Sequence, residues 1–361
     1  MRGSQTTHLP GIIPLRGRPG YPARMSPTLR TLGITLCLTL TALAGCGGAT
    51  SERIVLPPAA SLRSWSAIDG GGFAPDPQGR RVALAHQGLH IVAADGAEGP
   101  TLAPERPAVL AWSSDGRWLA AAFPNAQGAL LRRYDGGAAA AETSVPGQVT
   151  ALSVAADGTV LAVSVVLNAY SFGANVAGHL HRWSPEGTTA ALPLADSTIQ
   201  RRTTQSLGPH LLKGVSYAFS PRGDALVEAQ VTDPPVIETR LRIGVRDVLG
   251  GASQEIATVA LMSGGGVFAP DGESVWLGDG TQATRRYDVH SGQVLAVLPS
   301  PGRTLAVASD GIHVLADGQL FRGGERIASL GEDAVGRFAA GLLFLRRGTT
   351  LQVVDGLAAG R

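Results

Sequence analysis

Two histidines are spaced so that they could share a metal ion. His179 and His181 alternate in the segment GHLHRW, and alternate residues of a β-strand lie on the same face. A zinc site needs three or four ligands, and no further His, Cys, Asp or Glu cluster at ligand spacing accompanies the pair. We therefore expect no metal and no cofactor, and interpret the pair as packed or solvated side chains.

Motifs for nucleophilic, phosphate or haem chemistry are missing from the whole sequence. It contains no G-x-S-x-G nucleophile elbow, no Walker loop and no CxxCH motif. Arginine pairs at 132–133, 201–202, 285–286 and 346–347 would place one side chain on each face of a strand, and we interpret most of them as surface charge. No catalytic residue is assigned from these patterns.

Three long segments carry the side chains best suited to contact a partner protein. They span residues 167–178, 195–213 and 231–239 and interrupt an otherwise regular chain. Binding residues concentrate in loops that a rigid scaffold positions. The candidate partner-binding residues are Tyr170, Phe172, Arg201, Arg202, His210 and Asp233.

The scaffold for these segments is a repeated turn. A motif of the form small-x-Asp-Gly, preceded by an apolar residue and followed by a predicted strand, recurs in six copies, and FAAG at 338–341 is a degenerate seventh. The final glycine of each copy can adopt the positive φ that a tight turn requires. The turn glycines are Gly79, Gly116, Gly158, Gly223, Gly272, Gly311 and Gly341.

The strands after these turns share an unusual apolar pattern. In every copy two consecutive apolar residues stand three and four positions after the glycine, from Val82 and Ala83 in the first to Phe344 and Leu345 in the last. This pattern breaks the alternation of a half-buried strand, so it predicts strands that are buried on both faces. Sheets stacked face to face around an axis would bury them in this way.

Most copies also end a later strand with an aromatic, apolar or basic residue beside aspartate. The pairs are Ala94-Asp95, Tyr134-Asp135, Arg246-Asp247, Tyr287-Asp288 and Val354-Asp355, and the third copy has Trp183-Ser184. This pattern resembles the end of the third strand in WD-repeat propellers, whose bacterial relatives commonly carry SPDG-type turns. The resemblance covers residues 52–356 and implies an all-β propeller of four-stranded antiparallel blades.

The number of blades follows from the length of the repeat region. Divided by seven, residues 52–356 give about 44 residues per blade, which is usual for such repeats. The last copy is one strand short, and the chain has an unassigned strand, ERIVLPP, at 52–58. We predict that this strand completes the last blade and closes a seven-bladed ring. Six blades, without the copy at Gly341, is the alternative.

The N-terminal region has a different character. Arg30 precedes an apolar stretch at 32–43 that is too short to span a membrane, and the stretch ends in LAGC at 43–46. This sequence resembles the lipobox of bacterial lipoproteins. The resemblance implies that Cys46 is acylated and becomes the first residue of the mature protein.

The expected domain organisation follows from these signals. Residues 25–45 would be the lipoprotein signal peptide, 46–51 the lipidated cysteine with a short linker, and 52–361 a single propeller domain. Residues 1–24 are polar and proline-interrupted and precede a second methionine, so we interpret them as an extension from a start codon placed too far upstream.

The net charge and the cysteine content argue against some classes of function. The full chain has a net charge of +2, but 1–45 holds five arginines and no acidic residue, which leaves 25 basic against 28 acidic residues and a net charge of −3. A nucleic-acid surface is not supported. Cys37 and Cys46 are the only cysteines, so the mature domain has none for a disulfide or for thiol catalysis.

Together these observations predict a lipid-anchored propeller of the bacterial envelope that binds other envelope proteins as a monomer. It would touch the membrane only through its lipid, at the outer membrane or the outer leaflet of the cytoplasmic membrane, facing the periplasm or the exterior. The long segments would lie over blades three and four, on the face opposite the Asp-Gly turns.

The alternative is a propeller enzyme or small-ligand binder, such as a lactonase-like hydrolase, with its site in the central channel. Converging carboxylates, histidines and arginines in the channel would favour that alternative.

Overall fold

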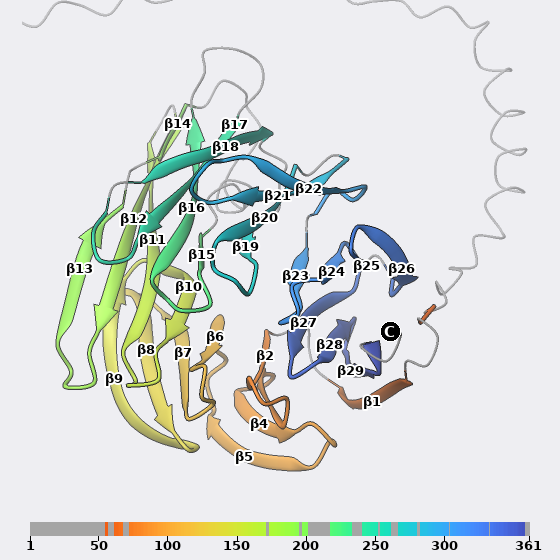
Figure 1. The fold of residues 1–361 in the computed structure, drawn as a ribbon. Helices are drawn as coiled ribbons and strands as arrows, with labels where there is room; N and C mark the ends of the chain where they lie inside the picture. The colour runs from red at the N-terminus through yellow and green to blue at the C-terminus, as the bar shows by residue number, and fades with distance from the viewer. Residues whose placement is uncertain are drawn as a thin grey trace, which may run out of the picture. The chain divides into compact units, whose positions relative to one another are not determined.

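The structure is a computed structural model that describes residues 55–56, 61–67, 72–170, 173–194, 197–200, 217–232, 240–251, 253–260, 266–279, 282–302, 304–331 and 333–357. These residues form seven antiparallel sheets (Figure 1). The predicted upstream extension, signal peptide and lipidated cysteine lie outside the described residues.

Each sheet is one blade. In blades one to six the strands follow one another in the sheet in chain order, whereas blade seven combines the last three strands of the chain with the first one. Blades one to three consist of β2 (Phe73–Pro75), β3 (Arg81–Ala85), β4 (Leu89–Ala93) and β5 (Glu98–Ala103); β6 (Val109–Trp112), β7 (Trp118–Asn125), β8 (Gly128–Asp135) and β9 (Ala138–Pro146); and β10 (Gln148–Val154), β11 (Val160–Tyr170), β12 (Gly173–Trp183), β13 (Thr189–Pro193) and β14 (Ser197–Gln200). In blade three β13 and β14 pair with different parts of β12.

The remaining blades repeat the same arrangement. Blades four to seven consist of β15 (Tyr217–Phe219), β16 (Ala225–Thr232), β17 (Arg240–Asp247) and β18 (Gln254–Ala260); β19 (Gly266–Phe268), β20 (Ser274–Gly278), β21 (Thr284–Asp288) and β22 (Val294–Leu298); β23 (Leu305–Val307), β24 (His313–Ala316), β25 (Gln319–Arg322) and β26 (Glu325–Ser329); and β27 (Val335–Ala339), β28 (Leu342–Arg347), β29 (Thr350–Asp355) and β1 (Ser61–Ala67).

The first strands of the blades form a closed inner ring. β2, β6, β10, β15, β19, β23 and β27 each contact the next in this order, and β27 contacts β2. The seven-bladed, four-stranded propeller is therefore confirmed, and the six-bladed alternative is wrong.

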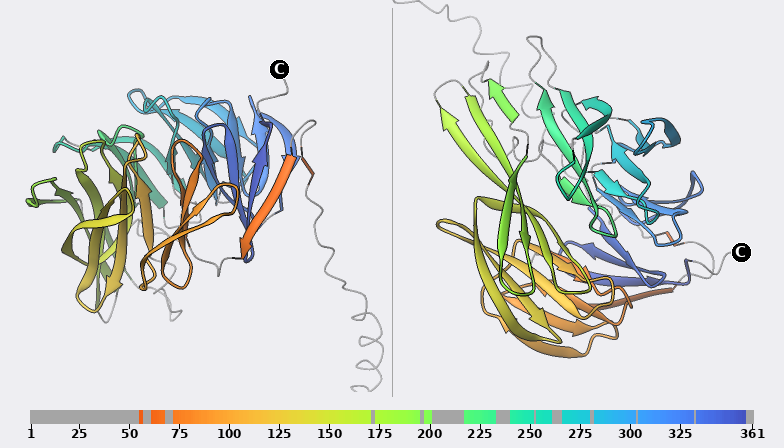
Figure 2. Two further views of the ribbon diagram at one scale, coloured as in Figure 1. Left: turned by 90° about the horizontal axis from the view of Figure 1, so that it is seen from below. Right: turned by 60° about the vertical axis from the view of Figure 1, so that its left-hand side comes forward.

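Ring closure uses a strand from the N-terminal side of the domain, but not the one that the sequence suggested. β1 pairs along its length with β29, from Ser61 opposite Asp355 to Ala67 opposite Thr350, and Figure 2 shows it beside the last strands of the chain. The prediction of 52–58 as the closing strand is wrong. That segment ends in two prolines, which have no N–H for a strand ladder, whereas SLRSWSA can donate throughout. Val55 makes only an isolated bridge with Ser329 of β26.

The repeated turns join the first and second strands of every blade. All seven turn glycines have positive φ, between 67° and 85°. In a typical case the N–H of Gly116 donates to the carbonyl of Ser113 at 2.9 Å. Because the turns occupy the same place in each blade, they lie on one face of the ring, here called the turn face; the other side is the opposite face.

The second strands form most of the core. β20 and β24 are buried along their whole length, β3 and β7 over most of it, and β28 over its middle residues. The predicted burial on both faces is confirmed for these strands. Apolar clusters between successive blades result from this packing.

Candidate functional site

The predicted segment 167–178 lies on the opposite face, but it is not a loop. β11 and β12 each have 11 residues, whereas the second strands of the other blades have between four and eight. The ladder continues from Leu167 opposite Val176 to Tyr170 opposite Gly173. The insertion is therefore a two-stranded extension of blade three, visible in Figure 2 (right).

The described parts of the three predicted segments are neighbours. β14, within 195–213, pairs with the β12 extension from Val176 to Gly173. β14 also contacts β16, whose last residues belong to the third segment. Of the six candidate partner-binding residues the structure places only Tyr170, at the end of β11. The others lie outside the described residues: Phe172, Arg201, Arg202, His210 and Asp233.

A groove borders this extension on the opposite face. It has a volume of about 640 Å³ and lies between the β7–β8 turn, the start of β10 and the outer half of β11. The described residues of its lining include no charged one: Ala108, Ala122, Pro124, Asn125, Ala126, Gln127, Gly128, Ala129, Gly147, Gln148, Val149, Val165, Val166 and Leu167. Sequence reasoning missed the groove, although the apolar run from Val165 to Leu167 beyond the usual strand length is a signal for it.

The turn face at the junction of blades two and three is filled by internal contacts. The guanidinium of Arg133 lies 5.2 Å from the ring centre of Trp118 and 4.9 Å from that of Trp183. It donates to the carbonyls of Gly158 at 2.6 Å and Pro185 at 3.0 Å. Arg133 is only 4% exposed, and this burial lowers the pKa of its guanidinium. The interpretation of the arginine pairs as surface charge is therefore wrong for Arg133.

The junction of blades one and two is bonded in the same manner. Trp112 Nε1 donates to the carbonyl of Ala74 at 2.9 Å, and Arg81 donates to the carbonyl of Gly116 at 2.8 Å. Gln78 donates to the carbonyl of Asp115 at 2.8 Å. These contacts use the polar groups of neighbouring turns to hold blades together, so they are not available to a partner.

The two histidines share a face, as predicted, but one of them is in the core. The ring centres of His179 and His181 are 6.2 Å apart. His181 is 3% exposed, and its Nε2 lies 2.8 Å from the hydroxyl of Ser164. Burial, with a smaller contribution from His179, lowers the pKa of His181 to about 4. Among the described residues no group of three or more ligands could hold a metal ion.

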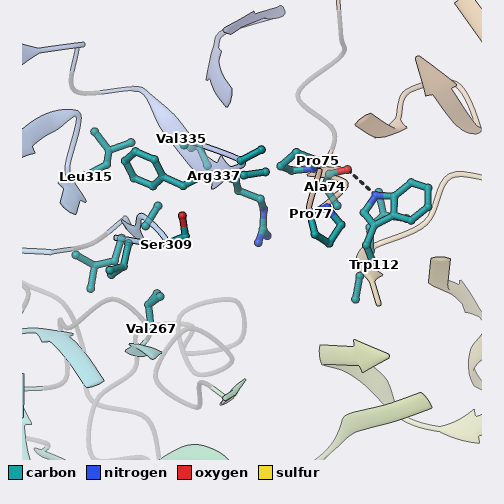
Figure 3. A pocket seen from close by; sticks show the side chains of 18 of the residues that line it. Ala74, Pro75, Pro77, Trp112, Val267, Ser309, Leu315, Val335 and Arg337 are labelled. Atoms are coloured by element: carbon teal, nitrogen blue, oxygen red, sulfur yellow. Dashed lines mark hydrogen bonds between the residues drawn. The ribbon is translucent and has the colours of Figure 1, made fainter. Parts of the chain in front are cut away.

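The central channel tests the enzyme alternative. A cavity of about 700 Å³ is lined by the first strands of six blades, mainly by small and apolar residues such as Ala74, Leu110, Leu152 and Val267 (Figure 3). The described lining contains no carboxylate and no histidine, and its one charged residue is Arg337. The described lining of this cavity thus lacks the converging carboxylates and histidines that would favour a lactonase-like hydrolase.

In the part of the chain that the structure describes, no helix has the length and apolarity to cross a bilayer.

Comparisons with known proteins agree on the fold. No protein-family model matches this sequence, and no curated protein sequence matches it. The β-propeller domain of Myceliophteria thermophila Cps50 (Swd1) is similar with a TM-score of 0.53 at 15% identity, over 84% of this chain and 98% of that one. A chain of the mitotic checkpoint complex gives 0.50 at 13% identity, over 84% and 93%. A chain of Kuenenia stuttgartiensis hydrazine synthase gives 0.50 at 12% identity, over 76% and 91%.

At these identities the likeness concerns the fold alone. The matched chains come from assemblies with different activities, one of them named as an enzyme, so the function has to be argued from the sites of this chain. What the comparisons and the blades together show is a WD-repeat-like, seven-bladed β-propeller, a fold consistent with a protein-interaction module.

Proposed function

We propose that this chain is a lipid-anchored propeller of the cell envelope that binds a partner protein on the opposite face of blades two to four. The observation that carries the proposal is the uncharged groove against the β11–β12 extension. The extension departs from the repeat, and the candidate residues predicted from the sequence belong to the same part of the chain.

The chemistry of the groove favours an apolar segment of a partner protein. Val165, Val166 and Leu167 form one wall, and the Pro124–Gly128 turn faces them across the groove. Leu167 is 36% exposed. Contiguous exposed apolar surface is uncommon on a monomer and marks sites of interaction. Asn125, Gln127 and Gln148 could bond the partner's backbone at the edges of the groove.

Anchoring is proposed from the N-terminal sequence. Acylation of Cys46 would hold the propeller at a membrane surface, where its partners would be other envelope proteins, because a multiply acylated terminus is a stable anchor. Cys46→Ser should abolish labelling by a metabolic fatty-acid probe and release the protein from the membrane fraction. Unchanged labelling and fractionation in this variant would contradict the lipoprotein assignment.

Partner binding is tested by quantitative crosslinking and capture from the native envelope. Leu167→Asp should reduce capture because it places a charge in the uncharged groove, and the combined change of Tyr170, Phe172, Arg201 and Arg202 to Ala should also reduce it. Neither variant should change the melting temperature.

The matched controls lie on the turn face. Arg117→Ala removes an exposed arginine that pairs with Asp135, and Glu273→Ala removes an exposed glutamate beside the fifth turn. Both should capture the partner as the parent does. Loss of capture only in these controls, or equal loss in all four variants, would show that the binding face is wrong.

A further inference from the structure

Arg337 occupies a position at which the six other blades carry uncharged residues. The equivalent position is defined by strand pairing. In each blade, the residue three positions after the turn glycine lies on the second strand, and the equivalent residue is its partner on the first strand. In blades one to six these residues are Pro75, Trp112, Ser153, Phe219, Phe268 and Val307. In blade seven Arg337 stands there, opposite Phe344. A charge on the inner ring is thus a property of one blade and not of the repeat.

The side chain of Arg337 extends into the central cavity. Figure 3 shows its nitrogens in the open space between Val335, Ser309 and Pro77. Its guanidinium makes no hydrogen bond or ion pair with any described residue, and the described lining offers no carboxylate. Although Arg337 is exposed to the cavity, protein surrounds it, and this desolvation lowers the pKa of its guanidinium. Arginine nevertheless stays protonated in proteins, so the cavity wall carries a positive charge that has no partner among the described residues.

A second polar group of the same cavity is also unsatisfied. The hydroxyl of Thr304 is buried and has no hydrogen-bond partner among the described residues, and Thr304 lines the cavity. It precedes β23, whose strand contacts β27, the strand that carries Arg337. Buried polar groups without partners are uncommon in native structures and call for an explanation. Thr304 is therefore a second hydrogen-bonding group without a described partner in the lining of this cavity.

We propose that the central cavity binds a small monocarboxylate with an apolar body, whose carboxylate accepts hydrogen bonds from Arg337. A guanidinium presents two parallel donors that match a carboxylate, and such charge-assisted paired hydrogen bonds are stronger than those between neutral groups. A single cation suits a singly charged ligand better than a phosphate dianion. The apolar wall and the volume of about 700 Å³ suit a small ligand with an apolar body. This site is separate from the groove on the opposite face.

The test is a calorimetric titration of the full chain with octanoate and, as a neutral analogue, octanamide. Octanoate should bind at least tenfold more tightly than octanamide. Arg337→Met should weaken octanoate binding at least tenfold, because it removes the charge and both hydrogen-bond donors that the carboxylate uses. Thr304→Val should weaken it less. Arg326→Met is the matched control, since Arg326 is exposed on the outer strand β26 and should not affect binding.

Several results would overturn the proposal. These are no binding of octanoate by the unaltered chain, equal affinity of the unaltered chain for octanoate and octanamide, or an octanoate affinity of Arg337→Met equal to that of the unaltered chain.

Melting curves establish that the variants are folded. If Arg337→Met does not fold, Arg337→Lys replaces it; this variant keeps the charge but loses the paired donors, and should bind octanoate more weakly than the parent. Unchanged octanoate affinity in Arg337→Lys would also contradict the proposal.

Discussion

The junction of blades two and three and the channel wall at blade seven each hold an arginine, but only the first is buried in the fold, whereas the second is exposed to the channel. At the junction Arg133 is stacked between Trp118 and Trp183 and bonded to carbonyls of the next blade. At blade seven Arg337 has no such partner among the described residues. Both guanidinium groups have a lowered pKa for the same reason, desolvation. The difference indicates that the first arginine serves the fold, whereas the second is free to serve a ligand.

The two regions also differ in how they are built. Blades two and three are each made from continuous chain, while blade seven combines β27, β28 and β29 with β1 from the other end of the domain. Closure of the ring therefore depends on a strand that is distant in sequence. We expect the whole domain to depend on this contact, because β1 covers the edge of β29 that would otherwise be exposed.

Deletion of residues 61–67 is expected to have the largest effect. It leaves blade seven with three strands and removes the cover of β29, whose Leu351, Val353 and Val354 are fully buried. The expected loss is comparable with the stability of a typical domain, about 5 kcal/mol or more. Circular dichroism and thermal melting are the measurements. Deletion of residues 47–51 is the control and should leave melting unchanged. A 61–67 deletion that melts within a degree or two of the parent would refute closure by β1.

Arg133→Met should destabilise the domain by about 3 kcal/mol, because it removes a buried charge-assisted network and leaves carbonyls of blade three without donors. Denaturant titration gives the free energy of unfolding. Arg117→Met is the matched control: Arg117 also stacks on Trp118, but it is exposed and its ion pair with Asp135 is open to solvent, so little change is expected. Equal losses in the two variants would mean that burial does not distinguish these arginines.

Most of the fold could be predicted from the sequence because it repeats. The Asp-Gly turns, the doubly buried second strands and the count of seven blades all depend on local patterns that recur. The closing strand could not be placed, because both 52–58 and 61–67 contain apolar residues and only long-range pairing with β29 selects between them. The extension at 167–178 looked like a loop because of its Asn, Ser and Gly residues. Strand propensity depends on context, and a neighbouring ladder extended into these residues.

The site was predictable only in part, and for a physical reason. The sequence Arg132-Arg133 in a strand indicates that the two side chains lie on opposite faces of the sheet. It does not show that Arg133 is enclosed, because the tryptophans on either side of it come from two different blades. Arg337 stands next to the degenerate FAAG copy, and only the register of the inner strands shows that it occupies the position of Trp112 and Phe268. Contacts between repeats cannot be read from the pattern within one repeat.

Blade three contains a buried polar group of another kind, a histidine whose neutral form is favoured by burial. Burial lowers the pKa of His181 to about 4, below its usual value of 6.5, and Ser164 bonds the ring. The unfolded chain therefore takes up a proton that the folded chain does not. Stability should fall as the pH drops below 6.5, by about 2 kcal/mol at pH 5, and the loss should be complete near pH 4.

The measurement is denaturant unfolding at pH 7.5 and pH 5. His181→Gln should flatten the difference between the two pH values. His290→Gln, which changes an exposed histidine in blade five, is the control and should keep the parent's difference. A parent-like pH dependence in His181→Gln would assign the acid sensitivity to other groups.

Arg337→Met should have the smallest effect on stability, and in the absence of added carboxylate it should not show the loss expected of Arg133→Met. Arg337 is exposed to the cavity and gives up no hydrogen bond to any described residue. We expect a free energy of unfolding within about 0.5 kcal/mol of the parent's value. Denaturant unfolding of both variants in carboxylate-free buffer gives the comparison. With octanoate added, the parent should gain stability by mass action and Arg337→Met should not. A loss in Arg337→Met as large as that in Arg133→Met would show that Arg337 holds the ring together, and the contrast between the two regions would then disappear.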